Sequence, residues 1–370
     1  MSRLPDADAV LATLRAIVSA PTAPYHEARA LAAIVAELER GGIDVRLDEY
    51  GQIHARVQRG AARPVAIVAH TDHPAFEIVS AHGHEGSARA LGGFRGSVLD
   101  VPARVQVYDD HGGGPFLATV DRFVPDLDTV HNSAGRLRIR SEGTLAPGQW
   151  AVVDLPGLEI AGDELRMRAA DDLAGCAMIV HALLEIARAS FPADVTGVFT
   201  RAEETGLYGA RLVAEDGAIP KDAFVISVEA SRALPHAPAG GGIVLRVGDL
   251  HNTFTNEAER FLRVAAERLQ RDGVATQRAL LDGGTCEASA FVVNGWDTTA
   301  IALPNENYHN RGPDDRFAPE IVRLRDLQSG IALLVEALRA VADDARETWW
   351  AHAGPVPDEV KTLLRGDGGS

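Results

Sequence analysis

The sequence predicts an α/β protein whose mostly parallel sheet is flanked by helices and interrupted by an inserted small β domain. Continuous apolar runs of about six residues recur along the chain, as in strands that are buried on both faces of a sheet. Stretches with helical apolar spacing alternate with these runs, and this alternation is typical of parallel sheets. The chain has 370 residues, of which 46% are apolar, so it is long enough for about two domains.

The N-terminal part of the chain contains the first helices and the first core strand. The elements expected here are helices at residues 6–20 and 25–41, a hairpin formed by residues 43–50 and 52–58, and a strand at Val65–His70. Gly41 and Gly42 end the second helix, and Gly51 supplies the turn of the hairpin. The strand is apolar almost throughout, which is typical of a strand inside a sheet.

The second half of the chain repeats this alternation of buried strands and helices. The expected strands lie at residues 195–200, 223–228 and 298–303, and the expected helices at residues 172–189, 256–271 and 321–345. Strands that alternate with helices usually pair in parallel. We therefore expect one largely parallel sheet that is covered by helices on both faces.

Residues 74–165 have a different composition from the rest of the chain. They are rich in Gly, Val and Arg, lack convincing helical spacing, and contain short alternating runs such as Ala103–Tyr108 and Leu117–Arg122. The Gly-rich end of the chain is expected to be disordered. The expected division is an α/β domain, an inserted β domain and a C-terminal tail, at residues 1–73 with 166–350, at 74–165, and at 351–370.

Charge and composition exclude several partners and locations. The net charge of -16 repels phosphate groups, which argues against nucleic acid and anionic membranes as partners. Two cysteines cannot build a disulfide framework in a chain of this size, and the acidic N-terminal segment differs from a signal peptide. The sequence contains no run of about 18 apolar residues that could span a membrane. We therefore expect a soluble, cytoplasmic protein.

Several common catalytic motifs are missing from the sequence. It contains no P-loop of the form GxxxxGK[ST], no nucleophile motif GxSxG and no zinc-binding motif HExxH. The remaining candidates for chemistry are clusters of histidines and carboxylates.

Five polar groups lie directly after core strands or at the start of a helix. They are His70 with Asp72, Asp171 with Asp172, Glu203 with Glu204, Glu229, and His309. Each has an ordinary alternative role, since an Asp before a helix is often a cap and a Glu pair is often a solvated surface. Together, however, they lie where α/β sheets bind ligands, at the carboxyl ends of strands. Asp72 lies two residues after His70, so its carboxylate can orient the imidazole.

These residue types indicate a site for two divalent metal ions. Histidine nitrogens and carboxylate oxygens form the mixed set of ligands that suits zinc, cobalt or manganese. Two divalent ions bring a charge of about +4, while Asp171, Glu204, Glu229 and a bridging hydroxide supply about -4. A dinuclear site would therefore be close to neutral.

The motifs resemble those of the glutamyl aminopeptidase family of dinuclear-zinc metallopeptidases, also called tetrahedral aminopeptidases. The matching segments are AHTD with His70, ADDLAG with Asp171, EETGLYGA with Glu203 and Glu204, the acid Glu229 after the next strand, and Tyr308 followed by His309. About 100 residues separate His70 from Asp171, which leaves room for the β domain that this family inserts there. The resemblance covers residues 6–345 and implies a zinc-peptidase-like three-layer sandwich.

The resemblance also implies a role for each candidate residue. The implied metal ligands are His70 and Glu229 for one ion, Glu204 and His309 for the other, and Asp171 as the bridge between them. Glu203 would be the general base and Asp72 would support His70. Zinc is the implied metal, with cobalt or manganese as alternatives. The inserted domain would act as a lid or in forming a homo-oligomer.

The expected activity is that of an aminopeptidase, in which a hydroxide bridging two metals attacks the N-terminal peptide bond of a peptide. Departures from the family pattern at His73, Leu173 and Cys286 bear on substrate specificity. An N-acyl amino acid deacylase or carboxypeptidase on the same metal core stays open, because Arg232 or Arg311 could bind a substrate carboxylate. Outside the hydrolases, the alternative is a metal-binding scaffold without activity.

Overall fold

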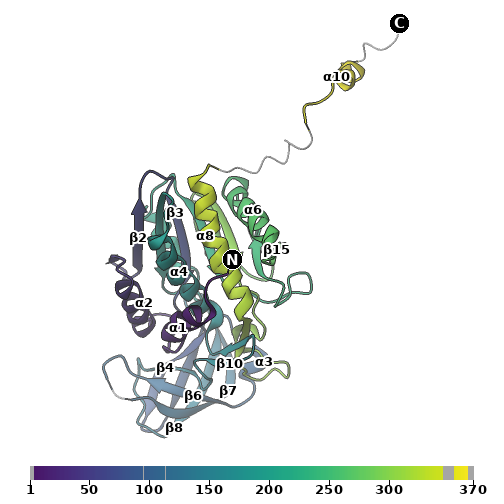
Figure 1. The fold of residues 1–370 in the computed structure, drawn as a ribbon. Helices are drawn as coiled ribbons and strands as arrows, with labels where there is room; N and C mark the ends of the chain where they lie inside the picture. Colours follow the sequence, from purple (N-terminus) through teal and green to yellow (C-terminus); the bar gives the residue numbers. More distant parts are fainter. Residues whose placement is uncertain (1–3, 95, 113, 345–353, 366–370) are drawn as a thin grey trace.

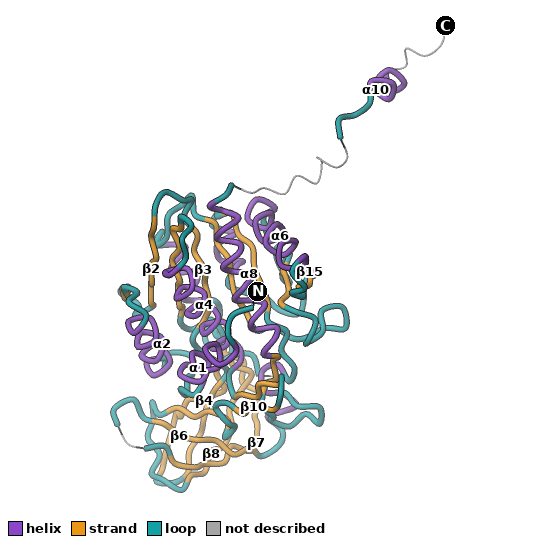
Figure 2. The backbone as a smooth tube through the Cα atoms, viewed as in Figure 1, coloured by secondary structure: helices purple, strands orange, loops and turns teal. Residues whose placement is uncertain are grey.

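The structure, a computed structural model, describes residues 4–94, 96–112, 114–344 and 354–365. It has a mixed α/β architecture in which a long sheet with its helices lies next to a barrel of strands (Figures 1 and 2). No helix within these ranges combines the length and the apolar character that a membrane span requires.

The central sheet places the ends of its parallel strands side by side. In the described part of the chain its strands follow the order β1 (Val45–Leu47), β2 (Ile53–Arg59), β12 (Ala193–Thr200), β3 (Val65–His70), β13 (Phe224–Glu229), β16 (Asp297–Ala302), β14 (Ile243–Arg246) and β15 (Thr276–Ala279). The central strands β12, β3, β13 and β16 are parallel, whereas the pairs β1–β2, β2–β12 and β16–β14 are antiparallel. The register pairs His70 with Thr200, so the segments after β3 and β12 leave the sheet at the same edge.

Helices cover both faces of this sheet because strand residues alternate between two apolar clusters. Val65 and Ile67 belong to the larger cluster, whereas Ala66 and Val68 belong to the smaller one. The helices of the larger cluster are α1 (Ala7–Val18), α2 (Ala28–Arg40), α4 (Ala170–Arg188), α6 (Asn256–Arg271) and α8 (Leu324–Ala342). Those of the smaller cluster are α5 (Tyr208–Glu215) and α7 (Ala288–Val293), neither of which the sequence patterns predict.

Residues between β3 and α4 form a closed barrel, which lies below the sheet in Figure 1. Its strands are β4 (Ala75–His82), β5 (Glu85–Leu91), β8 (Ser133–Ser141), β7 (Phe116–Asp128), β6 (Ala103–Tyr108) and β9 (Trp150–Val153), in the order in which they pair. The barrel encloses its own apolar core, which includes Phe76, Val105 and Ile139. A one-turn helix that the sequence does not predict, α3 (Gly96–Leu99), lies between β5 and β6 in the chain.

One predicted helix begins later than expected, because its first residues belong to a separate three-stranded sheet. Its strands are β10 (Glu159–Ala161), β11 (Glu164–Met167) and β17 (Glu320–Arg323), and they pair antiparallel. The helix predicted at residues 321–345 begins only at Leu324, as α8, because the preceding residues pair with β11 instead. The strands β10 and β11 also lie outside the barrel. The division of the chain into domains stays a prediction.

The segment after α8 contains the helix α10 (Asp358–Arg365), which stands apart from the rest of the protein (Figure 1). It lies within the predicted C-terminal tail. The predicted disorder concerns the last residues, of which 366–370 lie outside the described ranges.

Candidate metal centre

The residues predicted to form the site gather at the carboxyl edge of the central sheet. They are His70 at the end of β3, Glu229 at the end of β13, Glu203 and Glu204 after β12, Asp171 at the start of α4, and His309 in the 3-10 turn η1 (Tyr308–Asn310). Their side chains are buried or nearly buried. The chain therefore brings residues from five separate segments into one cluster, as expected where parallel strands end.

The carboxylate of Asp171 lies between the two histidines. Its Oδ1 atom is 3.2 Å from Nε2 of His70, and its Oδ2 atom is 3.3 Å from Nε2 of His309. On the first side, Glu229 Oε2 lies 3.8 Å from the His70 nitrogen. On the second side, Glu204 Oε1 lies 3.4 Å from the His309 nitrogen. One carboxylate thus faces two groups of ligand atoms, each with one histidine and one further acid.

Several polar atoms in this cluster are buried and have no hydrogen-bond partner. In the described part of the chain they include Asp171 Oδ1, Glu204 Oε1, Glu229 Oε1 and His309 Nε2. Buried acceptors without donors are costly, and a bound cation would satisfy all of them at once. Ligand atoms of His70, Asp171 and Glu204 also lie within 4.8 Å of one another. The residues present therefore fit two divalent metal ions.

Both histidines turn the same ring nitrogen toward the cluster. His70 Nδ1 lies 3.2 Å from the backbone carbonyl oxygen of Asp72, and His309 Nδ1 lies 3.0 Å from that of Gly93. A carbonyl oxygen only accepts, so each ring donates from Nδ1 and keeps Nε2 as an acceptor for a metal. The orientation of both imidazoles is thus set by backbone atoms.

Asp72 holds the Glu203–Glu204 pair more closely than it holds His70. Its carboxylate oxygens accept the backbone N–H groups of Glu203 at 2.9 Å and Glu204 at 3.0 Å. The nearest of these oxygens lies 3.5 Å from His70 Nδ1, beyond the backbone carbonyl of the same Asp. Asp72 therefore fixes the turn that carries the predicted base and one predicted ligand.

The cluster carries more buried acid than its two histidines can balance. Burial, with a smaller effect of the neighbouring acids, raises the pKa of Glu203 well above its ordinary value, although His70 acts against this. Burial raises the pKa of Glu204 and Glu229 as well. Burial also acts to raise the pKa of Asp171, but the His309 and His70 imidazoles beside its carboxylate outweigh burial and lower this pKa. Divalent cations would offset this concentration of negative charge.

Sequence patterns miss three residues that touch this cluster. Glu320, fully buried on β17, accepts the backbone N–H groups of both Asp171 and His309. His73 lies against the backbone carbonyl of Asp171. Asn132, at the end of the barrel loop, donates its side-chain N–H to the carbonyl oxygen of Glu204 at 2.9 Å. Only His73 carried a local signal, as a departure from the family pattern.

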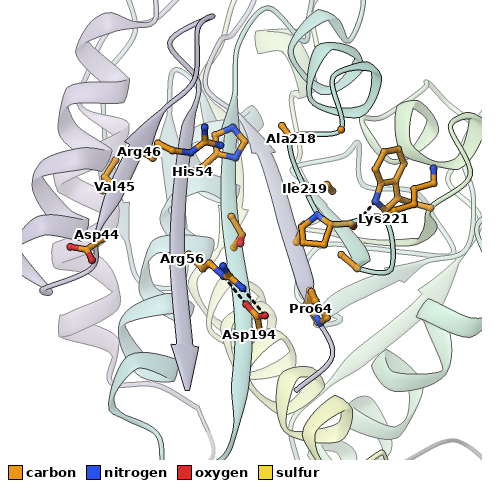
Figure 3. A pocket seen from close by; sticks show the side chains of 17 residues that line it. Asp44, Val45, Arg46, His54, Arg56, Pro64, Asp194, Ala218, Ile219 and Lys221 are labelled. Carbon is orange, nitrogen blue, oxygen red and sulfur yellow. Dashed lines mark hydrogen bonds and ion pairs between the residues drawn. The ribbon is translucent and has the colours of Figure 1, made fainter. Parts of the chain in front are cut away.

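Two hollows differ in their relation to the metal centre. A narrow cleft is lined by the three acids Asp171, Glu203 and Glu229 and by residues 281 and 283–285. A larger hollow, about 700 Å³, lies elsewhere and is shown in Figure 3. It is lined by Pro64 at the beginning of β3, whereas His70 is at the opposite end of that strand. Of these two hollows, the narrow cleft is the one lined by candidate metal ligands.

A mixed α/β fold that gathers histidines and carboxylates at its strand ends is typical of metal-dependent enzymes. Residues 140–333, about half of the chain, match the profile of the M42 glutamyl aminopeptidase family. The chain therefore belongs to the M42 glutamyl aminopeptidase family, as the sequence motifs predict.

Individual relatives are distant in sequence and close in fold. A putative aminopeptidase of Acetivibrio thermocellus is 26% identical over 185 residues, and the match spans 48% of this chain and 52% of that protein. An aminopeptidase of Desulfurococcus kamchatkensis is 20% identical, with a TM-score of 0.75 over 95% of this chain and 99% of that one. The TET1 peptidase of Pyrococcus horikoshii, described as assembling into a tetrahedron or an octahedral shell, is 20% identical, with a TM-score of 0.74 over 89% of this chain and 99% of that one.

Proposed function

We propose that the protein is a metal-dependent aminopeptidase that removes the N-terminal residue of peptides. The observation that carries this proposal is the Asp171 carboxylate between two histidine–acid groups, with the Glu203 carboxylate next to the first of them. Membership of the M42 family supports the same activity. The finer description of the fold as a zinc-peptidase-like three-layer sandwich belongs to this proposal.

Each of the two metals would be held by one histidine and one acid. His70 with Glu229 would hold the first, and His309 with Glu204 the second, with Asp171 shared between them. Zinc, cobalt and manganese all suit these nitrogen and oxygen ligands. When bound, the metals would polarise the scissile carbonyl and lower the pKa of water at the site.

Glu203 would move the proton during hydrolysis. Its Oε2 atom lies 3.9 Å from His70 Nε2, about as far as the Oε2 atom of Glu229 at 3.8 Å. The resemblance to the family gives Glu203 the role of base and Glu229 the role of ligand. A carboxylate in this place can accept a proton from the attacking water and pass it to the leaving amine. Asp72 holds the backbone N–H of Glu203, and the Glu203 side chain lines the cleft.

The cleft beside Glu203 would receive the side chain of the substrate's N-terminal residue. Leu281, Gly283, Gly284 and Thr285 form one wall of this cleft, and Arg246 also lines it. The Arg246 guanidinium donates to the carbonyl oxygens of Leu281 and Gly284, both at 3.1 Å, so the wall is fixed in place. The two glycines leave space at the centre of the wall.

The alternative on the same metal core is an N-acyl amino acid deacylase or carboxypeptidase. Arg232 lines the cleft together with Glu203 and would have to bind the substrate carboxylate. Arg311 is engaged by Asp315, 2.5 Å from its Nε atom. The family match favours the aminopeptidase over this alternative.

A substrate panel with controlled metal content tests the proposal. Purified protein is stripped of metal, reloaded with zinc, cobalt or manganese, and assayed with aminoacyl anilides and with N-acetyl amino acids. We expect about two metals per chain and release of the N-terminal residue that a chelator abolishes. Cleavage of N-acetyl amino acids alone would show that the protein is a deacylase instead. Metal binding without any hydrolysis would show that it is a metal-binding scaffold without activity.

The assembly and location of the protein are part of the proposal. One structural relative is described as a dodecamer and another as a tetrahedron or octahedral shell, which supports a homo-oligomer here. We propose that the barrel takes part as a lid or as a contact between subunits, and that the protein acts in the cytoplasm on peptides rather than on nucleic acid or membranes. Light scattering of the purified protein would measure the number of subunits.

A further inference from the structure

One buried carboxylate connects two distant segments of the metal centre. Glu320 is fully buried, and its Oε2 atom accepts the backbone N–H of Asp171 at 3.0 Å. Its Oε1 atom accepts the backbone N–H of His309 at 2.8 Å. The bridging acid and the second histidine are thus hydrogen-bonded to the same side chain, although they come from different elements.

His73 forms a second connection between the same segments. Its Nδ1 atom lies against the backbone carbonyl oxygen of Asp171, and its Nε2 atom lies 3.0 Å from Oδ1 of Asn310. The side-chain N–H of Asn310 donates to the carbonyl oxygen of Arg168 at 2.8 Å, which fixes the orientation of the amide. Both polar groups of the Asp171 backbone are therefore in contact with buried side chains, Glu320 and His73, that also contact residues 309 and 310.

The path of the chain explains why Glu320 lies at this point. On one side β17 pairs with β11, the strand that precedes α4 in the chain. In this pairing Glu320 lies opposite Met167. On the other side Ile321 exchanges both backbone hydrogen bonds with Glu306, shortly before His309. Glu320 thus lies on a strand between the two segments that deliver the ligands.

The turn that carries His309 needs such a restraint. Asn307, His309 and Asn310 all have a φ of 56°, in the left-handed region that non-glycine residues seldom adopt. Backbone of this kind persists only where the surrounding structure holds it. The hydrogen bond from the His309 N–H to Glu320 is one of the contacts that hold it.

We propose that Glu320, together with His73, is a positioning residue that sets the separation between the Asp171 carboxylate and the His309 imidazole before metal binds. This inference rests on the proposed function and adds to it a determinant of the second metal site. We call Glu320 and His73 the clamp. The first site depends less on the clamp, because its ligands His70 and Glu229 belong to strands of the central sheet. Loss of the clamp should therefore weaken the two metal sites unequally.

The test compares Glu320→Gln with a matched control. The Gln side chain keeps one acceptor oxygen but turns an N–H group toward the second backbone N–H, so one of the two hydrogen bonds is lost. Glu164→Gln makes the same chemical change on β11 of the same small sheet, where Glu164 pairs with Arg323 away from the metal ligands. Metal-free protein of each variant is titrated with Zn²⁺ in a calorimeter, and Co²⁺-loaded protein is compared by visible absorption.

We expect the wild type and Glu164→Gln to bind two metals with the same affinities. Glu320→Gln should bind one metal about 10- to 100-fold more weakly, as found when a residue that supports a ligand is changed. The affinity for the other metal should fall much less. Glu320→Asp, which keeps the charge but is shorter, should weaken the same site. At metal concentrations that fill the weakened site, KM of Glu320→Gln should return to the wild-type value.

Two results would overturn the inference. Wild-type affinity for both metals in Glu320→Gln would show that the clamp does not position the second site. An equal loss at both sites in both Glu320 variants, with a lower Tm of the metal-free protein, would assign Glu320 a purely structural role. Failure of the wild type itself to bind two metals would instead overturn the proposed function, and the inference with it.

Discussion

Replacement of Glu203 by Gln separates proton transfer from metal binding. The substitution keeps the size of the side chain and leaves the backbone N–H of Glu203 bonded to Asp72 at 2.9 Å. The amide cannot take up a proton, so the contribution of a general base is lost. That contribution is typically about 10²- to 10⁴-fold in rate, or about 3–5 kcal/mol in the activation barrier.

The structure also predicts what Glu203→Gln leaves unchanged. Glu203 is proposed as the base and not as a ligand, so the protein should still bind two metals with wild-type affinity. Burial raises the pKa of Glu203, which means that the folded state disfavours its ionised form. A neutral Gln avoids this cost, and we therefore expect no loss of Tm.

The assay measures kcat, metal content and Tm of the same preparation. Glu215→Gln, on the exposed face of α5 near Arg211, is the matched control and should retain full activity. Full activity of Glu203→Gln would refute its role as the base. Loss of a metal in this variant would instead show that Glu203 is a metal ligand.

Three further predictions concern stability. Removal of metal by a chelator should lower Tm, because the buried carboxylates lose their cationic partners. Metal added at 100 times its Kd should raise the free energy of unfolding by about 2.7 kcal/mol. An unchanged Tm would contradict a metal site here. Gly175→Ala places a Cβ atom against Asp172 Oδ1 and should cost about 1–3 kcal/mol, whereas Gly114→Ala, with no atom within 4 Å of the new Cβ, should leave Tm unchanged. Burial acts to raise the pKa of Asp48, but hydrogen bonds from Gln52 and its neighbours outweigh it and lower this pKa. The advantage of wild type over Asp48→Asn should therefore be complete above about pH 4 and shrink as the pH falls further; denaturant unfolding that shows a constant difference would contradict this.

The sequence predicts the strands of the central sheet well because their signal is local. Val65–His70 is buried throughout in the structure, and six consecutive residues suffice to show it. The helix predicted at residues 256–271 also coincides with α6, whose apolar and charged residues alternate regularly. Periodicity of this kind depends only on neighbours in the chain.

The sequence misses elements whose structure depends on distant partners. Residues 320–323 continue the helical pattern of α8 in sequence, yet they pair with β11, about 150 residues earlier. The order in which the barrel strands close, with β8 between β5 and β7, has no local signal either. Glu320 was missed for the same reason, since its importance depends entirely on that long-range pairing.

The arrangement of buried acids follows from where each ligand lies relative to the sheet. His70 and Glu229 belong to strands, so the hydrogen bonds of the sheet already fix their backbone. Residues beyond the strand ends have backbone N–H groups that the sheet does not bind, and a buried N–H needs an acceptor.

Two carboxylates meet this need, each for a pair of residues. Asp72 accepts from Glu203 and Glu204, and Glu320 accepts from Asp171 and His309. Each of these acids adds negative charge to a region that is already acidic, which raises the need for cations at the centre. Asp72 and Glu320 therefore hold the ligands in place and also increase the affinity of the site for divalent metal. Substitution of either acid should weaken metal binding although every metal ligand is kept.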